Sequence, residues 1–130
     1  MNDMLKKLGL RATPQRLAIL KLLQGNTAHP SAEEIYNKLK PDFPSLSLTT
    51  VYNTLESLAE GGMIQEIRID CSRRRFDPNP QPHYHFLCNK CRRVFDLDIN
   101  LINFDIPKQV GDFWVEGCFV NFYGYCMDCK

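Results

Sequence analysis

The densest group of potential metal ligands lies in residues 83–91, where two histidines and two cysteines occur within the run HYHFLCNKC. His83 and His85 are two positions apart, so on a strand both side chains would lie on the same face. Cys88 and Cys91 follow as a CxxC pair, a spacing at which a tight turn presents two thiolates to one ion. Thiolates favour zinc, whereas imidazoles completed by carboxylates suit a harder ion that exchanges. The stretch therefore predicts two metal sites of different character.

A second CxxC pair, Cys126 and Cys129, lies near the end of the chain. Together the four thiolates favour one tetrahedral Zn²⁺ with a structural role. A thiol oxidoreductase is the rival interpretation of a CxxC pair, and tightly bound stoichiometric zinc would dismiss it. The two other cysteines, Cys71 and Cys118, fit no metal-binding pattern, and we interpret them as spare thiols.

Composition places the chain among globular proteins and excludes disordered and fibrous classes. It has 130 residues, of which 44% are hydrophobic and 24% charged, enough for one ordinary domain or two small ones. We find neither an N-terminal secretory pattern nor an apolar run close to the roughly 20 residues of a membrane span. We therefore expect a cytoplasmic protein, in which six cysteines serve metal binding more readily than disulfides.

Three N-cap residues predict where the helices of the first half begin: Thr13, Ser31 and Ser47. Glu34 completes a capping box with Ser31, and Gly25 stands where a helix ends in a left-handed residue. The predicted elements are a short helix at 3–9, a helix at 14–24 after the Thr13 cap, a helix from the Ser31 cap to about 40, a helix at 48–60 after the Ser47 cap, and strands at 63–69 and 74–77. Three helices followed by a hairpin is the order of a winged helix-turn-helix domain.

In such a domain the third helix enters the major groove and the tip of the hairpin approaches phosphates. The net charge is only +1, but basic residues gather in the first half of the chain. Tyr52 can touch a thymine methyl group and Asn53 can pair with an adenine edge, so we expect a palindromic, A·T-rich operator in double-stranded DNA. The alternatives are that Tyr52 packs against the wing and that residues 73–75 form a solvated turn. The predicted DNA-contacting residues are Arg16, Thr49, Thr50, Tyr52, Asn53, Arg73 and Arg74.

A proline-rich segment, 78–82, predicts a stiff linker between two domains, 1–77 and 83–130. Beyond the linker, apolar alternation predicts strands at 83–88, 94–98 and 115–125. Residues 101–113 remain ambiguous, because Pro107 could open a short helix that Gly111 would weaken. The fold class we predict is α+β.

Several of these segments resemble the ferric uptake regulator (Fur) superfamily, and most closely its peroxide-responsive repressor branch. The resemblance rests on residues 13–16, 29–36, 47–55 and 83–85 and on the two CxxC pairs. It covers almost the whole chain, with the motifs in order at compatible spacing. It implies a homodimeric, metal-dependent transcriptional repressor, with an N-terminal winged helix-turn-helix domain and a C-terminal α/β dimerisation domain.

The resemblance also implies two metal sites. The structural zinc of the family falls on Cys88, Cys91, Cys126 and Cys129. The regulatory metal, Fe²⁺ or Mn²⁺ with Zn²⁺ as a further option, falls on His29, Asp77, His83, His85 and Asp96. Other branches often place histidines where this chain has Phe86 and Tyr125, so we expect no third metal.

The regulatory ligands come from both sides of the linker, so we expect a bound ion to tie the two domains together and favour the DNA-binding dimer. In the peroxide branch, H₂O₂ reacts at bound iron and oxidises a ligand histidine, here His29 or His83, which releases metal and DNA. One alternative is a regulator that senses iron, manganese or zinc without responding to peroxide. Another is a hydrolase that uses the His/Asp site, but the sequence shows no nucleophile constellation for it, and we predict that the protein is not an enzyme.

Overall fold

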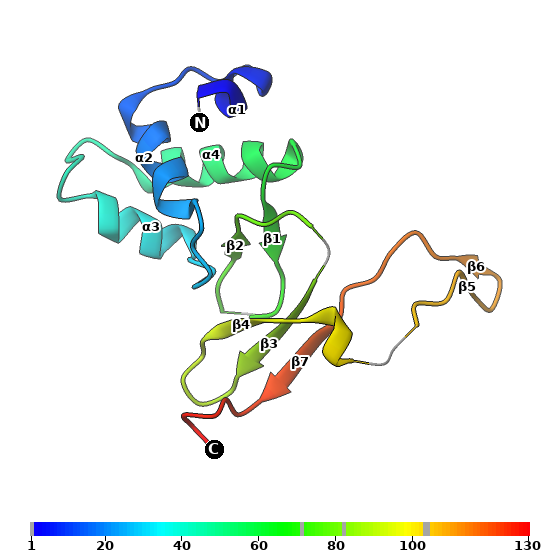
Figure 1. Ribbon diagram of the computed structural model, residues 1–130. Helices are drawn as coiled ribbons and strands as arrows, with labels where there is room; N and C mark the ends of the chain where they lie inside the picture. Colours follow the sequence, from blue (N-terminus) through cyan, green and yellow to red (C-terminus); the bar gives the residue numbers. More distant parts are fainter. Residues whose placement is uncertain (1, 71, 82, 103–104) are drawn as a thin grey trace. The chain divides into compact units, whose positions relative to one another are not determined.

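The computed structural model in Figure 1 describes residues 2–70, 72–81, 83–102 and 105–130. The chain divides after Gln81 into two compact units, each with its own internal contacts. The finer division into 1–77, 78–82 and 83–130 stays a prediction. In the described ranges, no helix is both long and apolar enough to cross a membrane.

The described residues of the first unit form four helices: α1 Asn2–Lys7, α2 Pro14–Leu23, α3 Ala32–Leu39 and α4 Leu48–Glu60. The three predicted N-caps are confirmed, because Thr13, Ser31 and Ser47 each accept a hydrogen bond from the backbone N–H three residues later, at 3.1–3.2 Å. Gly25 has the left-handed φ of 67° expected after α2. The helix boundaries are therefore determined by short-range contacts within the sequence.

The wing follows α4 as two short antiparallel strands, β1 Gln65–Ile67 and β2 Arg75–Asp77. Phe76 of β2 is fully buried with residues from the helices, including Ile19, Ile35 and Leu55. The wing thus packs on the same core as the helices, and the predicted winged helix-turn-helix order is confirmed.

The second unit is built on a three-stranded sheet in the order β4-β3-β7. Its strands are β3 Tyr84–Cys88, β4 Val94–Leu97 and β7 Asn121–Gly124. β3 pairs with β4 in antiparallel and with β7 in parallel orientation, and the second pairing sets Cys88 opposite Gly124. The remaining elements are the 3-10 helix η1 Ile99–Leu101 and a small hairpin of β5 Gln109–Val110 and β6 Phe113–Trp114. Helices and strands in one chain confirm the α+β class.

One sequence prediction in this unit was wrong. The strand predicted at 115–125 forms only at Asn121–Gly124, because these are the residues that pair with His85 to Cys88 of β3. The sequence left residues 101–113 ambiguous, and in the described part, 105–113, the structure has the β5–β6 hairpin and not a short helix from Pro107; Gly111, with a left-handed φ of 57°, lies in its turn.

Candidate metal centres

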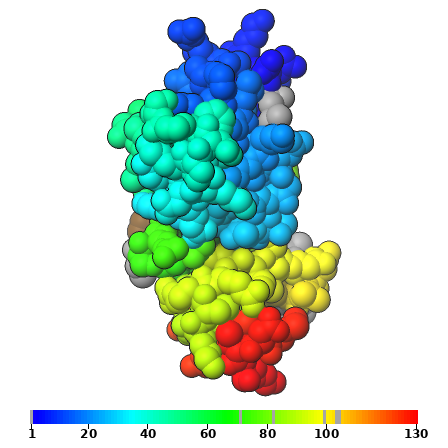
Figure 2. All heavy atoms as spheres, turned by 90° about the vertical axis from the view of Figure 1, so that its left-hand side faces the viewer, coloured from blue at the N-terminus to red at the C-terminus, as the bar shows by residue number. Residues whose placement is uncertain are grey.

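The two CxxC pairs meet because β3 and β7 are parallel neighbours. Cys88 ends β3, and Cys126 follows closely after β7, so their loops leave the sheet at the same edge. Figures 1 and 2 show the red C-terminal segment beside the loop that follows β3. The four sulfur atoms of Cys88, Cys91, Cys126 and Cys129 all lie within 4.8 Å of one another, and the sulfurs of Cys91 and Cys126 are 3.9 Å apart. A tetrahedral zinc with Zn–S bonds of about 2.3 Å requires S···S distances of about 3.8 Å. The donor set and its spacing therefore fit Zn²⁺.

The four thiols differ in how readily they ionise. Backbone N–H groups of Cys126 and Cys91 point at the Cys88 sulfur from 3.5 Å and lower its pKa to about 5. Hydrogen bonding with Cys126 has the opposite effect on Cys129, whose pKa is raised to about 12. Four adjacent thiolates repel one another, so a divalent cation among them is what allows all four to ionise.

Arg93 is a residue of this site that the sequence reasoning missed. Its Nε donates to the Cys91 sulfur at 3.4 Å, and its Nη2 donates to the Cys126 sulfur at 3.8 Å. The same Nη2 donates to Asp128 Oδ2 at 3.0 Å. Arg93 thus joins both CxxC loops and lowers the pKa of the Cys91 thiol. A basic residue two positions after a CxxC pair is the signal that could have identified it.

A second group of ligand atoms forms where β3 and β4 pair. His85 lies opposite Asp96 in the antiparallel register, and the rings of His83 and His85 are 4.4 Å apart on one side of the strand, as the alternation predicted. The Nε2 atoms of His83 and His85 lie 3.0 and 3.3 Å from the same Asp96 Oδ1. Two imidazole nitrogens and one carboxylate oxygen converging in this way form a donor set suited to Fe²⁺, Mn²⁺ or Zn²⁺.

The other two predicted regulatory ligands lie in the first unit. His29, between α2 and α3, has its Nδ1 3.6 Å from Oδ2 of Asp77 at the end of β2, and both side chains are buried. An imidazole beside a carboxylate is again a metal-type pair, and the carboxylate oxygen offsets part of a divalent charge. The structure thus brings the predicted ligands together as a pair in the first unit and a triad in the second.

The predicted DNA-contacting residues include several that bind acidic side chains. The Tyr52 hydroxyl of α4 donates to Oε1 of Glu33 on α3 at 2.5 Å. The Arg74 guanidinium lies 5.5 Å from the centre of the Tyr52 ring, so Tyr52 does contact the wing, as one of the alternatives proposed. Thr49 and Asn53, by contrast, are exposed on α4.

The wing arginines are paired in the same way. Arg74 Nε lies 2.7 Å from Oε1 of Glu66, and its Nη1 lies 2.9 Å from Oε1 of Glu56. Arg73 Nη1 lies 2.9 Å from Oε1 of Glu34. The sequence reasoning missed these acidic partners, because Glu34 and Glu56 are distant from the wing along the chain.

The other predicted residues have simpler surroundings. Thr50 lies in the first turn of α4, where its N–H donates to the Ser47 cap at 3.1 Å and the two hydroxyls are 2.9 Å apart. Arg16 Nη1 donates to the Arg11 carbonyl at 3.0 Å. Cys118 is exposed, and Cys71 lies outside the described residues.

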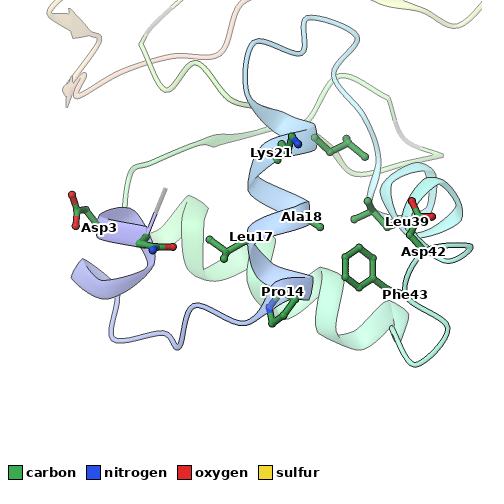
Figure 3. A pocket seen from close by; sticks show the side chains of 10 residues that line it. Asp3, Pro14, Leu17, Ala18, Lys21, Leu39, Asp42 and Phe43 are labelled. Atoms are coloured by element: carbon green, nitrogen blue, oxygen red, sulfur yellow. The ribbon is translucent and has the colours of Figure 1, made fainter.

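A surface groove of about 920 Å³ lies beside α2 in the first unit (Figure 3). Its walls are mostly aliphatic and aromatic, with Asp3, Lys21 and Asp42 as the charged side chains. None of its ten lining residues is a histidine, cysteine or serine. The groove therefore contains none of the predicted metal ligands.

Comparison with known proteins gives a consistent result. The sequence profile of the Ferric uptake regulator family matches residues 7–123. The peroxide-responsive repressor PerR of Staphylococcus epidermidis is 38% identical over 128 residues, which cover 97% of this chain and 85% of that relative.

Two solved structures are similar over nearly their full length. The Campylobacter jejuni peroxide stress regulator aligns with a TM-score of 0.69 and 33% identity, covering 99% of this chain and 98% of its own. The ferric uptake regulator of Francisella tularensis with iron aligns with a TM-score of 0.73 and 25% identity, covering 93% and 95%.

Proposed function

The chain belongs to the ferric uptake regulator family, and from this membership we propose that it is a metal-dependent, DNA-binding transcriptional repressor that responds to peroxide. The observation that carries the proposal is the convergence of His83 and His85 on Asp96. It provides an imidazole-rich site in the same unit as the four-cysteine cluster. The similarity to PerR of S. epidermidis and to the C. jejuni peroxide stress regulator supports the peroxide response.

We assign the two metals by donor type. The four cysteines would hold Zn²⁺ and keep the two CxxC loops together. His29, Asp77, His83, His85 and Asp96 would hold Fe²⁺ or Mn²⁺. Neither the pair nor the triad completes a coordination shell alone, so an ion with all five ligands would restrict the linker and raise the population of one domain arrangement. Bound Fe²⁺ would supply one-electron reduction of H₂O₂, which Mn²⁺ does not readily perform.

The DNA-binding surface would consist of α4 and the wing, and the operator would be palindromic and A·T-rich. A palindromic operator suits a dimer, and the second unit exposes several large apolar side chains that a partner subunit would cover. Its exposed side chains include Phe113, Trp114, Phe119 and Tyr123, each at least 76% exposed. The dimer would therefore form through the second unit.

An iron uptake regulator that does not respond to peroxide is the second candidate. It is favoured by the similarity to the F. tularensis regulator, whose structure contains iron. Both candidates use the same fold and ligand types, so only the response to peroxide separates them.

The test is to compare the Fe²⁺ and Mn²⁺ forms of protein purified without oxygen. After brief exposure to H₂O₂, peptides containing His29 or His83 should gain the mass of one oxygen atom in the iron form alone. Fluorescence anisotropy with a labelled operator should show DNA release in parallel, while the Mn²⁺ form stays bound. Unmodified histidines and full DNA binding in the iron form would favour the uptake regulator instead.

A further inference from the structure

His29 has an unusual backbone conformation. Its φ of 52° lies in the left-handed region, which residues other than glycine rarely adopt. The next residue is Pro30, whose ring further restricts the conformation of the residue before it. A left-handed residue before proline costs conformational free energy and persists only where surrounding contacts hold it. His29 is therefore held in place by its neighbours.

The contacts that hold it come from β2. The Phe76 N–H donates to the Pro30 carbonyl at 3.1 Å, and Ser31 forms an isolated antiparallel bridge with Arg75. The Arg75 side chain then reaches the residue itself, because its Nη1 donates to the His29 carbonyl at 3.2 Å. The loop before α3 is thus fixed to the wing strand by two main-chain contacts and one side chain.

Arg75 is buried, and its other contacts lead to Asp70 and, through it, to Ser72, the two residues that we call the wing turn. Its side chain is 7% exposed, and its Nη2 lies 3.5 Å from Oδ2 of Asp70, whose side chain is 1% exposed. Asp70 Oδ1 accepts hydrogen bonds from the Ser72 N–H at 3.0 Å and the Ser72 hydroxyl at 2.6 Å, so Ser72 is bound to Asp70. Glu34 Oε1 lies 3.8 Å from Arg75 Nη1.

The strand geometry relates these contacts to the metal ligands. Arg75 and Asp77 are two positions apart on β2, so their side chains leave the same face of the strand. One contacts the His29 carbonyl, and the other lies beside the His29 imidazole. Holding the carbonyl fixes the direction in which the imidazole leaves the backbone.

We propose that Arg75 is a positioning residue for the regulatory metal: it holds His29 in its left-handed conformation and, through Asp70, couples that ligand to the conformation of the wing turn. The inference rests on the proposed assignment of His29 and Asp77 as ligands. Because coupling between two sites is reciprocal, a change at Asp70 that disorders the wing turn also weakens metal binding at His29.

The test is the Mn²⁺ affinity of the full-length, zinc-loaded protein, measured from the free Mn²⁺ signal in electron paramagnetic resonance. The main variant is Arg75→Gln combined with Asp70→Asn, because changing both leaves no unpaired buried charge. Loss of an outer contact to a metal ligand lowers affinity by about 10- to 100-fold, and we expect a loss in that range. Arg73→Gln is the matched control: it removes the same charge from an exposed arginine of the same wing, and we expect a change of about twofold or less.

Arg75→Lys is a second variant, which keeps the charge opposite Asp70 but cannot bond both Asp70 and the His29 carbonyl through a planar guanidinium. It keeps the test valid if the double variant does not fold, as judged by circular dichroism. All Mn²⁺ affinities are measured at a temperature well below each variant's unfolding midpoint and at unchanged zinc content. A general loss of stability then does not contribute to the measured affinity. A folded Arg75 variant whose Mn²⁺ affinity stays within about threefold of the wild type would overturn the inference. If the wild type itself binds no Mn²⁺, the proposed metal site is wrong. This result differs from a wild type that binds Mn²⁺ and an Arg75 variant that binds it equally well, which overturns only the role of Arg75.

Discussion

The hydroxyl of Tyr52 connects α4 to α3, and Tyr52→Phe removes only that connection. The donor–acceptor distance of 2.5 Å to Glu33 Oε1 is typical of a charge-assisted O–H···O⁻ bond. Hydrogen bonds to charged groups contribute about 1.5–3 kcal/mol when buried, but Glu33 is exposed, so solvent reduces the contribution to about 1 kcal/mol. We expect the variant to lose this amount of unfolding free energy from the first unit.

The loss should depend on pH, because the bond shifts both partners. It lowers the pKa of Glu33 below 4.5 and raises that of Tyr52 above 10.0. Stabilisation through Glu33 is present above pH 4.5 and is lost as the pH falls through the lower folded-state pKa. Stabilisation through Tyr52 is present below pH 10.0 and is lost as the pH rises through the higher folded-state pKa. The difference between wild type and variant should therefore be constant near neutral pH and shrink at both extremes.

Urea unfolding followed by circular dichroism reports on the four helices of the first unit, whereas the single tryptophan, Trp114, lies in the second. Tyr36→Phe is the control, because it removes the same hydroxyl from a ring that contacts Lys40 Nζ instead. A double-mutant cycle with Glu33→Gln should give a coupling of about 1 kcal/mol. Additive single effects, or a difference that stays the same from acidic to alkaline pH, would refute the reasoning.

Three further predictions concern the metal and DNA surfaces. Cys129→Ser should remove the zinc and weaken dimerisation, measured by metal analysis and size-exclusion chromatography; a zinc-free variant with normal dimer stability would contradict the structural role. Arg93→Gln should lower zinc affinity about 10-fold in chelator competition, whereas Lys90→Gln, in the same loop, should change it little; equal effects would mean that only net charge matters. Arg74→Gln leaves Glu56 and Glu66 without their counter-charge, so it should weaken binding to operator and unrelated DNA alike. The slope of log affinity against log salt concentration should fall by about one. A loss confined to the operator would show that Arg74 reads bases.

The sequence by itself determined the elements whose signals are local. A cap such as Ser31 acts on an amide three residues away, and a glycine such as Gly25 can adopt the left-handed conformation that ends a helix without a steric penalty. The spacing within each CxxC pair and between His83 and His85 is local in the same sense. Ligand types and helix starts were therefore predictable, together with the winged-helix order that follows from them.

Tertiary structure alone decided what depends on contacts between distant residues. The length of β7 is limited by its pairing with β3, and the same pairing brings Cys88 to Cys126. Tyr52 meets Glu33 because α3 packs against α4, and neither residue carries a sequence signal for the other. The sequence placed Arg75 on a wing strand or in a solvated turn but could not predict its burial, because a buried arginine and an exposed one have the same sequence pattern until the core that surrounds them has formed.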